Sequence, residues 1–178
     1  MKTVAIDLGA CIGKYTLPFS RTYDQVIAIE PHPDNAAHLR EMFKDTENVE
    51  IIEAAVSNTN EPQKLHLHVR IRTVGTMASS LKVEKNNVLK DTFHTVTTIK
   101  LSELLKARGI ERVAILKMDI EGSEYDVFED LLDEEMMGTI DKIMYECHLD
   151  KVKGLAEASA TTIERLKPWR ARIADMGD

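Results

Sequence analysis

The sequence predicts an α/β fold, built as a doubly wound, mostly parallel Rossmann-like sheet with a β-rich insertion and a shortened carboxyl-terminal end. Short apolar runs that end in turn residues alternate with segments of helical period, which is typical of parallel strands joined by helices. A turn with two glycines follows the first apolar run, and a β-rich stretch at residues 62–100 interrupts the alternation. A chain of 178 residues is long enough for one such domain, so we expect residues 1–178 to form a single domain.

The first apolar run leads into the loop that we interpret as a cofactor site. Residues 4–8 read as a buried strand and residues 14–23 as the helix that follows. Gly9 and Gly13 allow a tight turn and a close approach by a ligand, and a helix start offers unpaired backbone N–H groups. The spacing differs from the G-x-G-x-x-G loop of dinucleotide-binding proteins. An ordinary strand–helix turn is the alternative for this loop taken alone. The cofactor-binding candidates here are Asp7, Gly9, Ala10 and Gly13.

The next two apolar runs add three cofactor-binding candidates. Residues 25–30 read as the second strand, and Glu30 at its end is placed to accept hydrogen bonds from a ribose diol. A surface glutamate before a turn is the alternative. Pro31 ends this strand and is the second candidate. The third run, Val49 to Ala55, reads as a further strand, and the stretch at residues 53–58 would approach the base of a nucleotide-type cofactor without one side chain being singled out by the pattern. Ala55, within this stretch, is the third candidate.

The β-rich stretch is predicted to form an antiparallel unit at the edge of the parallel sheet. Polar and apolar residues alternate over residues 64–72, which indicates a half-buried strand with one wet face. Residues 95–99 are a second β-branched run. His66 and His68 would share the wet face, and we interpret them as solvated rather than as metal ligands.

A second group of titratable residues follows two later strands. Residues 113–118 read as a central strand that ends before Asp119, and residues 142–147 read as the next strand, with Glu146 and His148 at its end. Functional sites in open α/β sheets form beyond the carboxyl ends of the strands. Crowded carboxylates raise one another's pKa, so one of these groups is suited to take a proton from an acceptor hydroxyl. The catalytic candidates are Asp119, Glu146 and His148. No metal is predicted, because carboxylates in a crevice are not a metal signature.

The helix after this central strand and the end of the chain complete the expected elements. Ser123 and Asp126 resemble a capping box at the start of the helix, where Glu124 would favour the helix dipole. A further helix is predicted at residues 155–166 and a last short strand at residues 170–174.

Composition excludes several classes of partner. Asp and Glu number 30 against 23 Lys and Arg, so the net charge is −7, which disfavours non-specific binding to nucleic acid or to an anionic membrane. No apolar run approaches the length of a membrane span, and the first residues lead directly into a strand without the pattern of a signal peptide. Two cysteines do not make a disulfide framework. We expect a cytoplasmic protein.

Four segments together resemble the FkbM family of methyltransferases. They are residues 7–13 (DLGACIG), 30–33 (EPHP), 116–124 (LKMDIEGSE) and 146–148 (ECH), and the third is the most specific of them. The resemblance covers residues 4–148 and implies a class I methyltransferase fold that binds S-adenosyl-L-methionine. It also implies methyl transfer to oxygen on a sugar or another small-molecule acceptor. The glycine loop would hold the methionine end of the cofactor, Glu30 the ribose, and residues 119–124 and 146–148 the acceptor.

The sequence departs from the family pattern at both ends. The first strand begins almost at Met1, and only residues 149–178 follow the last motif, whereas the class I fold usually ends in an antiparallel pair of strands. We therefore expect the final sheet edge to be either truncated or covered by a second copy in a homodimer. Two alternatives remain for the function. One is a protein of the same fold that binds the cofactor, or a partner, without catalysis, and the other is an NAD-dependent oxidoreductase.

Overall fold

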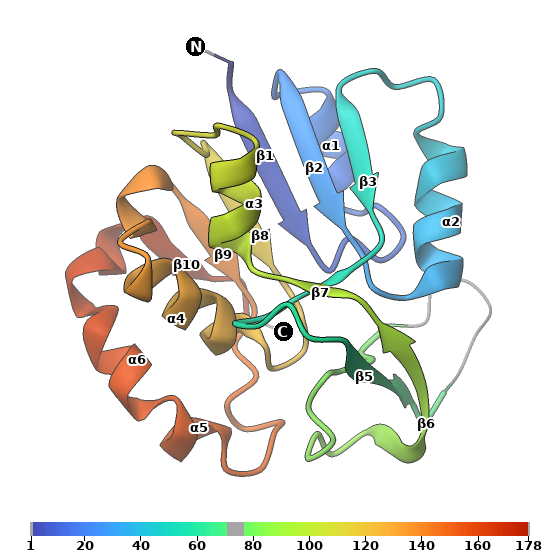
Figure 1. Cartoon of the computed structure of the whole chain (residues 1–178), viewed down its shortest axis with the longest axis vertical. Helices are drawn as coiled ribbons and strands as arrows, with labels where there is room; N and C mark the ends of the chain where they lie inside the picture. Colours follow the sequence, from blue (N-terminus) through green and yellow to red (C-terminus); the bar gives the residue numbers. More distant parts are fainter. Residues whose placement is uncertain (1, 71–76, 178) are drawn as a thin grey trace.

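A computed structural model describes residues 2–70 and 77–177, and its centre is a six-stranded parallel sheet (Figure 1). The strand order is β3-β2-β1-β8-β9-β10, and each neighbouring pair is parallel. This arrangement confirms the doubly wound α/β prediction. The strands are β1 (Val4–Leu8), β2 (Gln25–Ile29), β3 (Val49–Ile52), β8 (Ile115–Met118), β9 (Ile143–Tyr145) and β10 (Ile173–Asp175).

Helices cover both faces of the sheet (Figure 1). The first two helices pack against β2 and β3, while the third and fourth pack against each other on the opposite face. The sixth helix lies beside the fourth, and the fifth contacts the sixth. The helices are α1 (Thr16–Ser20), α2 (Pro33–Met42), α3 (Leu101–Ala107), α4 (Glu124–Asp133), α5 (Leu155–Ala158) and α6 (Ala160–Arg165), with 3₁₀ turns η1 (Met137–Thr139) and η2 (Lys167–Arg172).

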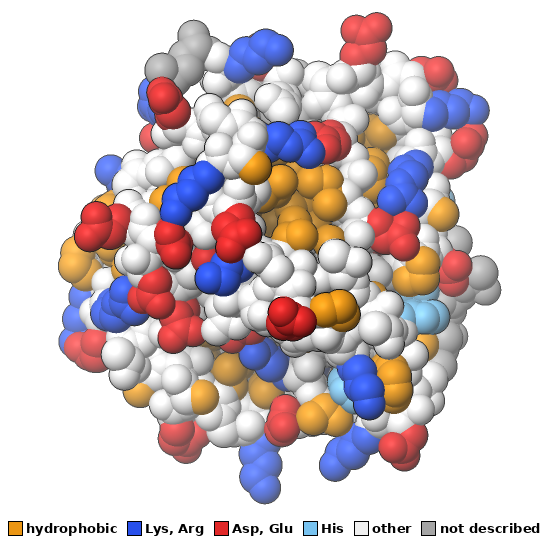
Figure 2. All heavy atoms as spheres, in the orientation of Figure 1, with side chains coloured by type: hydrophobic (Ala, Val, Ile, Leu, Met, Phe, Trp, Pro, Cys, Tyr) orange, Lys and Arg blue, Asp and Glu red, His pale blue; other side chains and the backbone are white. Residues whose placement is uncertain are grey.

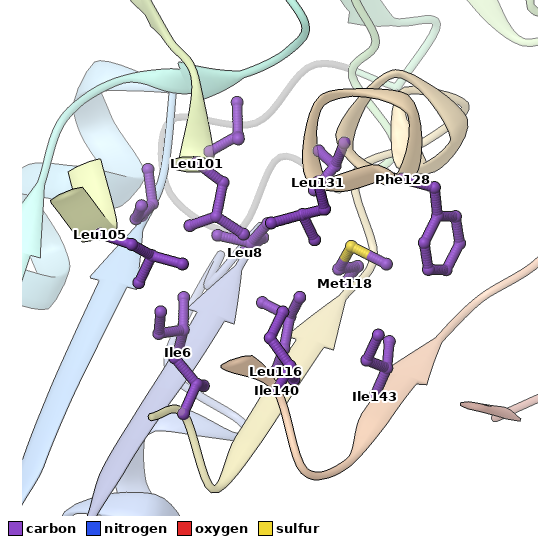
Figure 3. Close-up of a cluster of buried hydrophobic side chains, with 14 of the residues drawn as sticks. Ile6, Leu8, Leu101, Leu105, Leu116, Met118, Phe128, Leu131, Ile140 and Ile143 are labelled. Carbon is purple, nitrogen blue, oxygen red and sulfur yellow. The ribbon is translucent and has the colours of Figure 1, made fainter. Parts of the chain in front are cut away.

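The core is divided between the two faces because successive strand residues point to opposite sides. Ile6 and Leu8 of β1 face α3 and α4, and they pack with Leu116 and Met118 of β8 in the largest cluster (Figure 3). Ala5 faces the other way and packs with Phe19 of α1 in a smaller cluster. Both faces of the central strands are therefore buried, as the near-continuous apolar runs predict.

The insertion forms its own small sheets. β5 (Gln63–His68) pairs antiparallel with β6 (Val88–Val96), while β4 (Ala55–Val56) pairs with β7 (Thr98–Ile99) in parallel. The antiparallel prediction is confirmed, but the predicted position at the edge of the parallel sheet is wrong. In the described part of the chain, these strands hydrogen-bond to one another and not to the six-stranded sheet. The insertion lies beyond the carboxyl ends of the central strands (Figure 1).

Several local expectations need correction. The predicted strand 49–55 is divided into β3 and β4, and the predicted helix 155–166 is divided at Ser159 into α5 and α6. His66 is 7% exposed rather than solvated, because its ring packs against Phe93. The predicted strand 64–72 ends at His68 in the structure, and its last two residues, Ile71 and Arg72, lie outside the described residues.

The last described strand differs from the usual end of the class I fold. β10 is a three-residue edge strand that pairs with β9 in parallel, where the class I fold would have an antiparallel pair. It begins at Ile173, three residues later than the predicted strand, because the 3₁₀ turn η2 continues through Arg172.

The surface carries both signs of charge. Acidic and basic side chains alternate over the face in Figure 2, where hydrophobic side chains gather in a hollow between them. Within the described residues, the helices are all too short or too polar to cross a membrane.

Candidate functional site

A hollow opens at the carboxyl ends of β1, β2 and β8, and the insertion forms its other wall. It measures about 670 Å³ when its open mouth is included. Gly9, Glu30 and Asp119 line it from the parallel sheet, while Leu65 and Ala78 line it from the insertion. The strand order reverses between β1 and β8, so the hollow lies at the topological switch point where doubly wound sheets bind ligands.

The predicted cofactor-binding residues divide into two groups. Gly9, Glu30, Pro31 and Ala55 line the hollow. Asp7, Ala10 and Gly13 do not line it and are buried instead. Gly13, with φ +85°, packs against α2 through Leu39 and Phe43. This second group shapes the loop.

Gly9 is required by the close approach of two backbone segments. Its φ is +72°, and a Cβ at this position would lie 2.0 Å from the carbonyl oxygen of Asp119. The amides of Gly9 and Ala10 donate to the carbonyl of Ile29, and the amide of Gly13 donates to the carbonyl of Ala10. The prediction of unpaired backbone N–H groups is therefore wrong for these three amides, because each of them donates to a backbone carbonyl of the protein. The loop brings β1 against β8 and shapes the floor of the hollow.

Glu30 is held in place at the edge of the hollow by three hydrogen bonds. Its side chain is almost fully buried, and it accepts hydrogen bonds from the amides of Cys11 and His32, both at 2.9 Å, and from the Asn35 amide group at 3.3 Å. Burial raises its pKa, and these three donors oppose that rise. Cys11 has φ +50°, a conformation that turns its amide toward Glu30. A carboxylate held on both oxygens is positioned to accept further hydrogen bonds from a ligand.

Asp7 has a structural environment. It lies on the α1 face of β1 and is fully buried, with Thr16 donating to one carboxylate oxygen at 2.7 Å and Lys117 Nζ lying 3.1 Å from the other. Lys117 also donates to the carbonyl of Gly9 at 2.9 Å. This buried ion pair cross-links β1, β8 and the glycine loop. No sequence pattern predicted this role of Lys117.

The three catalytic candidates lie close together. One ligand atom from each of Asp119, Glu146 and His148 falls within 4.8 Å of the others. Glu121 and Glu124 contribute to the same cluster through His148. The ends of the two strands therefore bring these side chains together, as predicted. Of the three candidates, Asp119 alone lines the hollow.

His148 is a buried cation. It is fully buried, its Nδ1 lies 3.0 Å from Glu124 Oε1, and its Nε2 lies 3.0 Å from Glu121 Oε2. Burial opposes the charge, but hydrogen bonds and attraction from Glu121 and Glu124 outweigh it and raise the pKa of His148 to about 10. At neutral pH the imidazole is protonated, so it has no lone pair with which to act as a base. Burial opposes the charge of Glu121 as well, but His148 and the ammonium group of Lys85 outweigh it and lower the pKa of Glu121 to about 2.

Asp119 has the properties of a base. Burial raises its pKa to about 6, with further upward contributions from Glu121 and Glu146 and opposing ones from Lys117 and His148. A base with a pKa near the working pH combines a large ionised fraction with a strong pull on the proton. Glu146 instead accepts a hydrogen bond from Lys151 at 2.9 Å.

Asp119, Glu146 and His148 are close enough to share one metal ion. Such an ion would have to displace the proton of His148 and the ammonium group of Lys151, which already supply positive charge there. In the absence of an ion, the imidazolium and the Lys151 ammonium balance part of the negative charge of the cluster.

The helix cap beside this cluster also differs from expectation. Ser123 is the N-cap of α4, but its hydroxyl makes no capping bond. Glu124 caps the turn instead, with one oxygen accepting from the amide of Ile120 and the other from the amide of Gly122. Glu124 therefore orients both the loop after Asp119 and the ring of His148.

Lys85 of the insertion also belongs to this site, although no sequence pattern predicted it. Its side chain is fully buried, and its Nζ lies 2.7 Å from Glu121 Oε2. Nothing in the local sequence marks it, because residues 82–87 (KVEKNN) are almost uniformly polar.

Comparison with known proteins agrees with this geometry. The family model for the methyltransferase FkbM domain matches residues 7–177, which is nearly the whole chain. Among curated proteins, none matches the chain. The glycine loop, Glu30 and the acidic cluster all lie within the matched range, and the chain belongs to the FkbM methyltransferase domain family.

Proposed function

We propose that this protein transfers a methyl group from S-adenosyl-L-methionine to a hydroxyl oxygen of a sugar or another small molecule. The observation that carries this proposal is that Glu30 and Asp119 line one hollow on either side of Gly9. One carboxylate is held by backbone amides, and burial raises the pKa of the other to about 6. Membership of the FkbM family supports methyl transfer as the reaction class.

The described residues fit this cofactor. Glu30 would accept hydrogen bonds from the ribose hydroxyls. Pro31, after the end of β2, and Ala55, at the start of β4, would lie against the adenine ring. Gly9 would leave room for the rest of the molecule beside Asp119. Asp7, Ala10 and Gly13 would act indirectly, by fixing the shape of the loop.

The chemistry divides simply between cofactor and protein. The sulfonium of the cofactor supplies an already activated methyl group, so the protein has to align the acceptor oxygen and remove its proton. Asp119 would take that proton, because its carboxylate lines the hollow and its pKa is about 6. Glu146 and His148 would influence the pKa of Asp119 through their charges, without taking the proton themselves.

Binding measurements on the purified chain test the cofactor. Isothermal titration should detect S-adenosyl-L-methionine and S-adenosylhomocysteine, with NAD giving no heat. Glu30→Gln should weaken both about tenfold or more, since a carboxylate is the stronger acceptor for a diol. Glu53→Gln, at an exposed residue that pairs with Arg40, is a matched control and should bind as the unmodified protein does. Binding of NAD alone would support the oxidoreductase and overturn the proposal.

Transfer is tested with labelled cofactor. The protein is incubated with methyl-labelled S-adenosyl-L-methionine and a cell extract, and the labelled product is identified. A labelled ether on a small molecule supports the proposal. Cofactor binding without a labelled product over a broad acceptor panel would favour the non-catalytic alternative.

We also propose that a second copy pairs at the β10 edge to give a homodimer. β10 ends the sheet, and Ala174 and Asp175 are exposed there. An open edge strand presents unpaired backbone groups that another chain can cover. Light scattering over a concentration series should show a dimer, whereas a monomer at high concentration would count against this.

A further inference from the structure

The insertion reaches the acidic cluster through one buried lysine. Lys85 has a fully buried side chain, although its neighbours Glu84 and Asn86 are exposed. Its Nζ lies 2.7 Å from Glu121 Oε2, and it donates to the Ala78 carbonyl at 2.9 Å and to the Asn87 side chain at 2.8 Å. An ammonium group has three protons, so these contacts use all of its donors. A lysine is rarely buried unless it is paired in this way.

Glu121 is held a second time by the same segment. The hydroxyl of Ser80 donates to the carbonyl of Glu121 at 2.6 Å. Glu121 has φ +59°, a left-handed conformation that costs a non-glycine residue roughly 1–2 kcal/mol. Such a conformation persists only where its surroundings hold it, and Lys85 and Ser80 hold Glu121 together with His148. The backbone of the segment is fixed as well, through a bridge between Lys85 and Val152.

The charges of the cluster pair in a definite pattern. Glu121 is paired with Lys85 and His148, and Glu124 with His148. Glu146 is paired with Lys151. Lys117, which lies near Asp119 on the chain, is instead paired with Asp7. Within residues 2–70 and 77–177, Asp119 is the carboxylate of this group without an ion-pair partner at hydrogen-bond distance.

We propose that Lys85 is a positioning residue, which pins the insertion to the site and neutralises Glu121 so that Asp119 is the carboxylate left to take the acceptor's proton. This inference rests on the proposed role of Asp119 in methyl transfer. It goes beyond that role because it makes the insertion part of the electrostatics of the site.

The groups that act on Asp119 come from three elements. Lys117 of β8 and His148 after β9 lower the pKa of Asp119, while Glu121 and Glu146 raise it. Without Lys85, Glu121 would have to share the proton of His148 with Glu124. The negative charge facing Asp119 would then grow, so its pKa would rise.

The test is a titration of Asp119 by ¹³C carboxyl NMR in the whole protein, with its signal assigned by comparison with Asp119→Asn. Lys85→Met should raise the titration midpoint of Asp119 by roughly one pH unit. Lys85→Arg, which keeps the charge, should restore most of the original midpoint. Lys90→Met, at an exposed lysine on β6, should leave the midpoint unchanged. An unchanged midpoint in folded Lys85→Met would overturn the proposal.

A second variant separates charge from loosening and covers the case in which Lys85→Met does not fold. Glu121→Gln removes the negative charge itself, so the midpoint of Asp119 should fall rather than rise. If Lys85 only held the insertion in place, both Lys85→Met and Glu121→Gln would loosen the insertion, and the titration midpoint of Asp119 would move in the same direction in both variants. Hydrogen exchange at the amides of residues 78–88 should quicken in Lys85→Met. Neither measurement needs cofactor or acceptor, so failure of methyl transfer and failure of this inference are distinguishable.

Discussion

Gly9 and Asp119 touch backbone to backbone across the ends of β1 and β8, so closely that a Cβ on Gly9 would lie 2.0 Å from the carbonyl oxygen of Asp119. This contact joins the cofactor loop to the proposed base. It explains why the loop needs glycine at this position even though its amides are occupied by the protein. Four expectations follow from this and the neighbouring contacts.

The first concerns Gly9→Ala. The left-handed φ of +72° and the clash with Asp119 together should lower the free energy of unfolding by about 2–4 kcal/mol. Gly109→Ala is the matched control, because Gly109 has φ +60° but no neighbour within 4 Å of its Cβ position. It should cost about 1 kcal/mol. Urea denaturation of both variants measures the difference, and equal losses would contradict the role given to the contact.

The second concerns the buried pair of Asp7 and Lys117. Lys117→Met leaves the carboxylate of Asp7 buried without its cation and should cost about 3–5 kcal/mol. The double variant Asp7→Asn/Lys117→Met removes both charges and should recover part of that loss. Denaturation curves of the two variants give the comparison. If the double variant were less stable than Lys117→Met, the unpaired charge of Asp7 would not be the main cause of the loss of stability in Lys117→Met.

The third concerns the pH dependence of turnover. The base must be ionised, so the rate should rise with pH through about 6, the pKa of Asp119, and then level off. Asp119→Asn should lower turnover about a hundredfold or more and remove this rise, with little change in cofactor affinity. The measurement is initial rate against pH with the acceptor found in the labelling experiment. Unchanged turnover in Asp119→Asn would remove this residue from the mechanism.

The fourth concerns stability at alkaline pH. The pKa of His148 is raised from 6.5 to about 10 in the folded protein, so its ion pairs stabilise the fold fully below about pH 6.5. Between these values the stabilisation should shrink by about 1.4 kcal/mol per pH unit, and it should be lost above about pH 10.

Thermal or urea unfolding from pH 6 to 10 measures this loss. His148→Gln, which cannot carry the charge, should be less stable at pH 6.5 and should show a flatter dependence on pH. NMR titration of the His148 ring in the unmodified protein gives the same information without a variant. A midpoint near 6.5 would contradict the buried imidazolium.

Much of the fold could be predicted because its signals are local. The apolar runs of β1, β2 and β8 are buried on both faces, which leaves a pattern visible in a few consecutive residues. Gly9 and Glu30 follow such runs, and strand ends in a parallel sheet meet at one edge. That is why the hollow could be placed from the sequence, along with Asp119.

The remaining features depend on contacts between distant segments. The insertion was expected at the sheet edge because alternation indicates a strand but says nothing about which surface that strand covers. His66 looked solvated for the same reason, and its burial comes from Phe93 on the paired strand. Asp7 resembled a cofactor ligand, but the alternation of strand side chains turns it under α1 toward Lys117.

By itself, the sequence determined the sheet, the position of the hollow and the family, since strand pattern, glycine spacing and motif order are properties of short segments. Only the tertiary structure decided the protonation states of the site residues. His148 is a cation because Glu121 and Glu124 contact its two ring nitrogens, and Lys85 reaches Glu121 from a segment 36 residues away in the chain. The protonation state of a side chain depends on its burial and on its neighbours in space, and neither can be inferred from a short stretch of sequence.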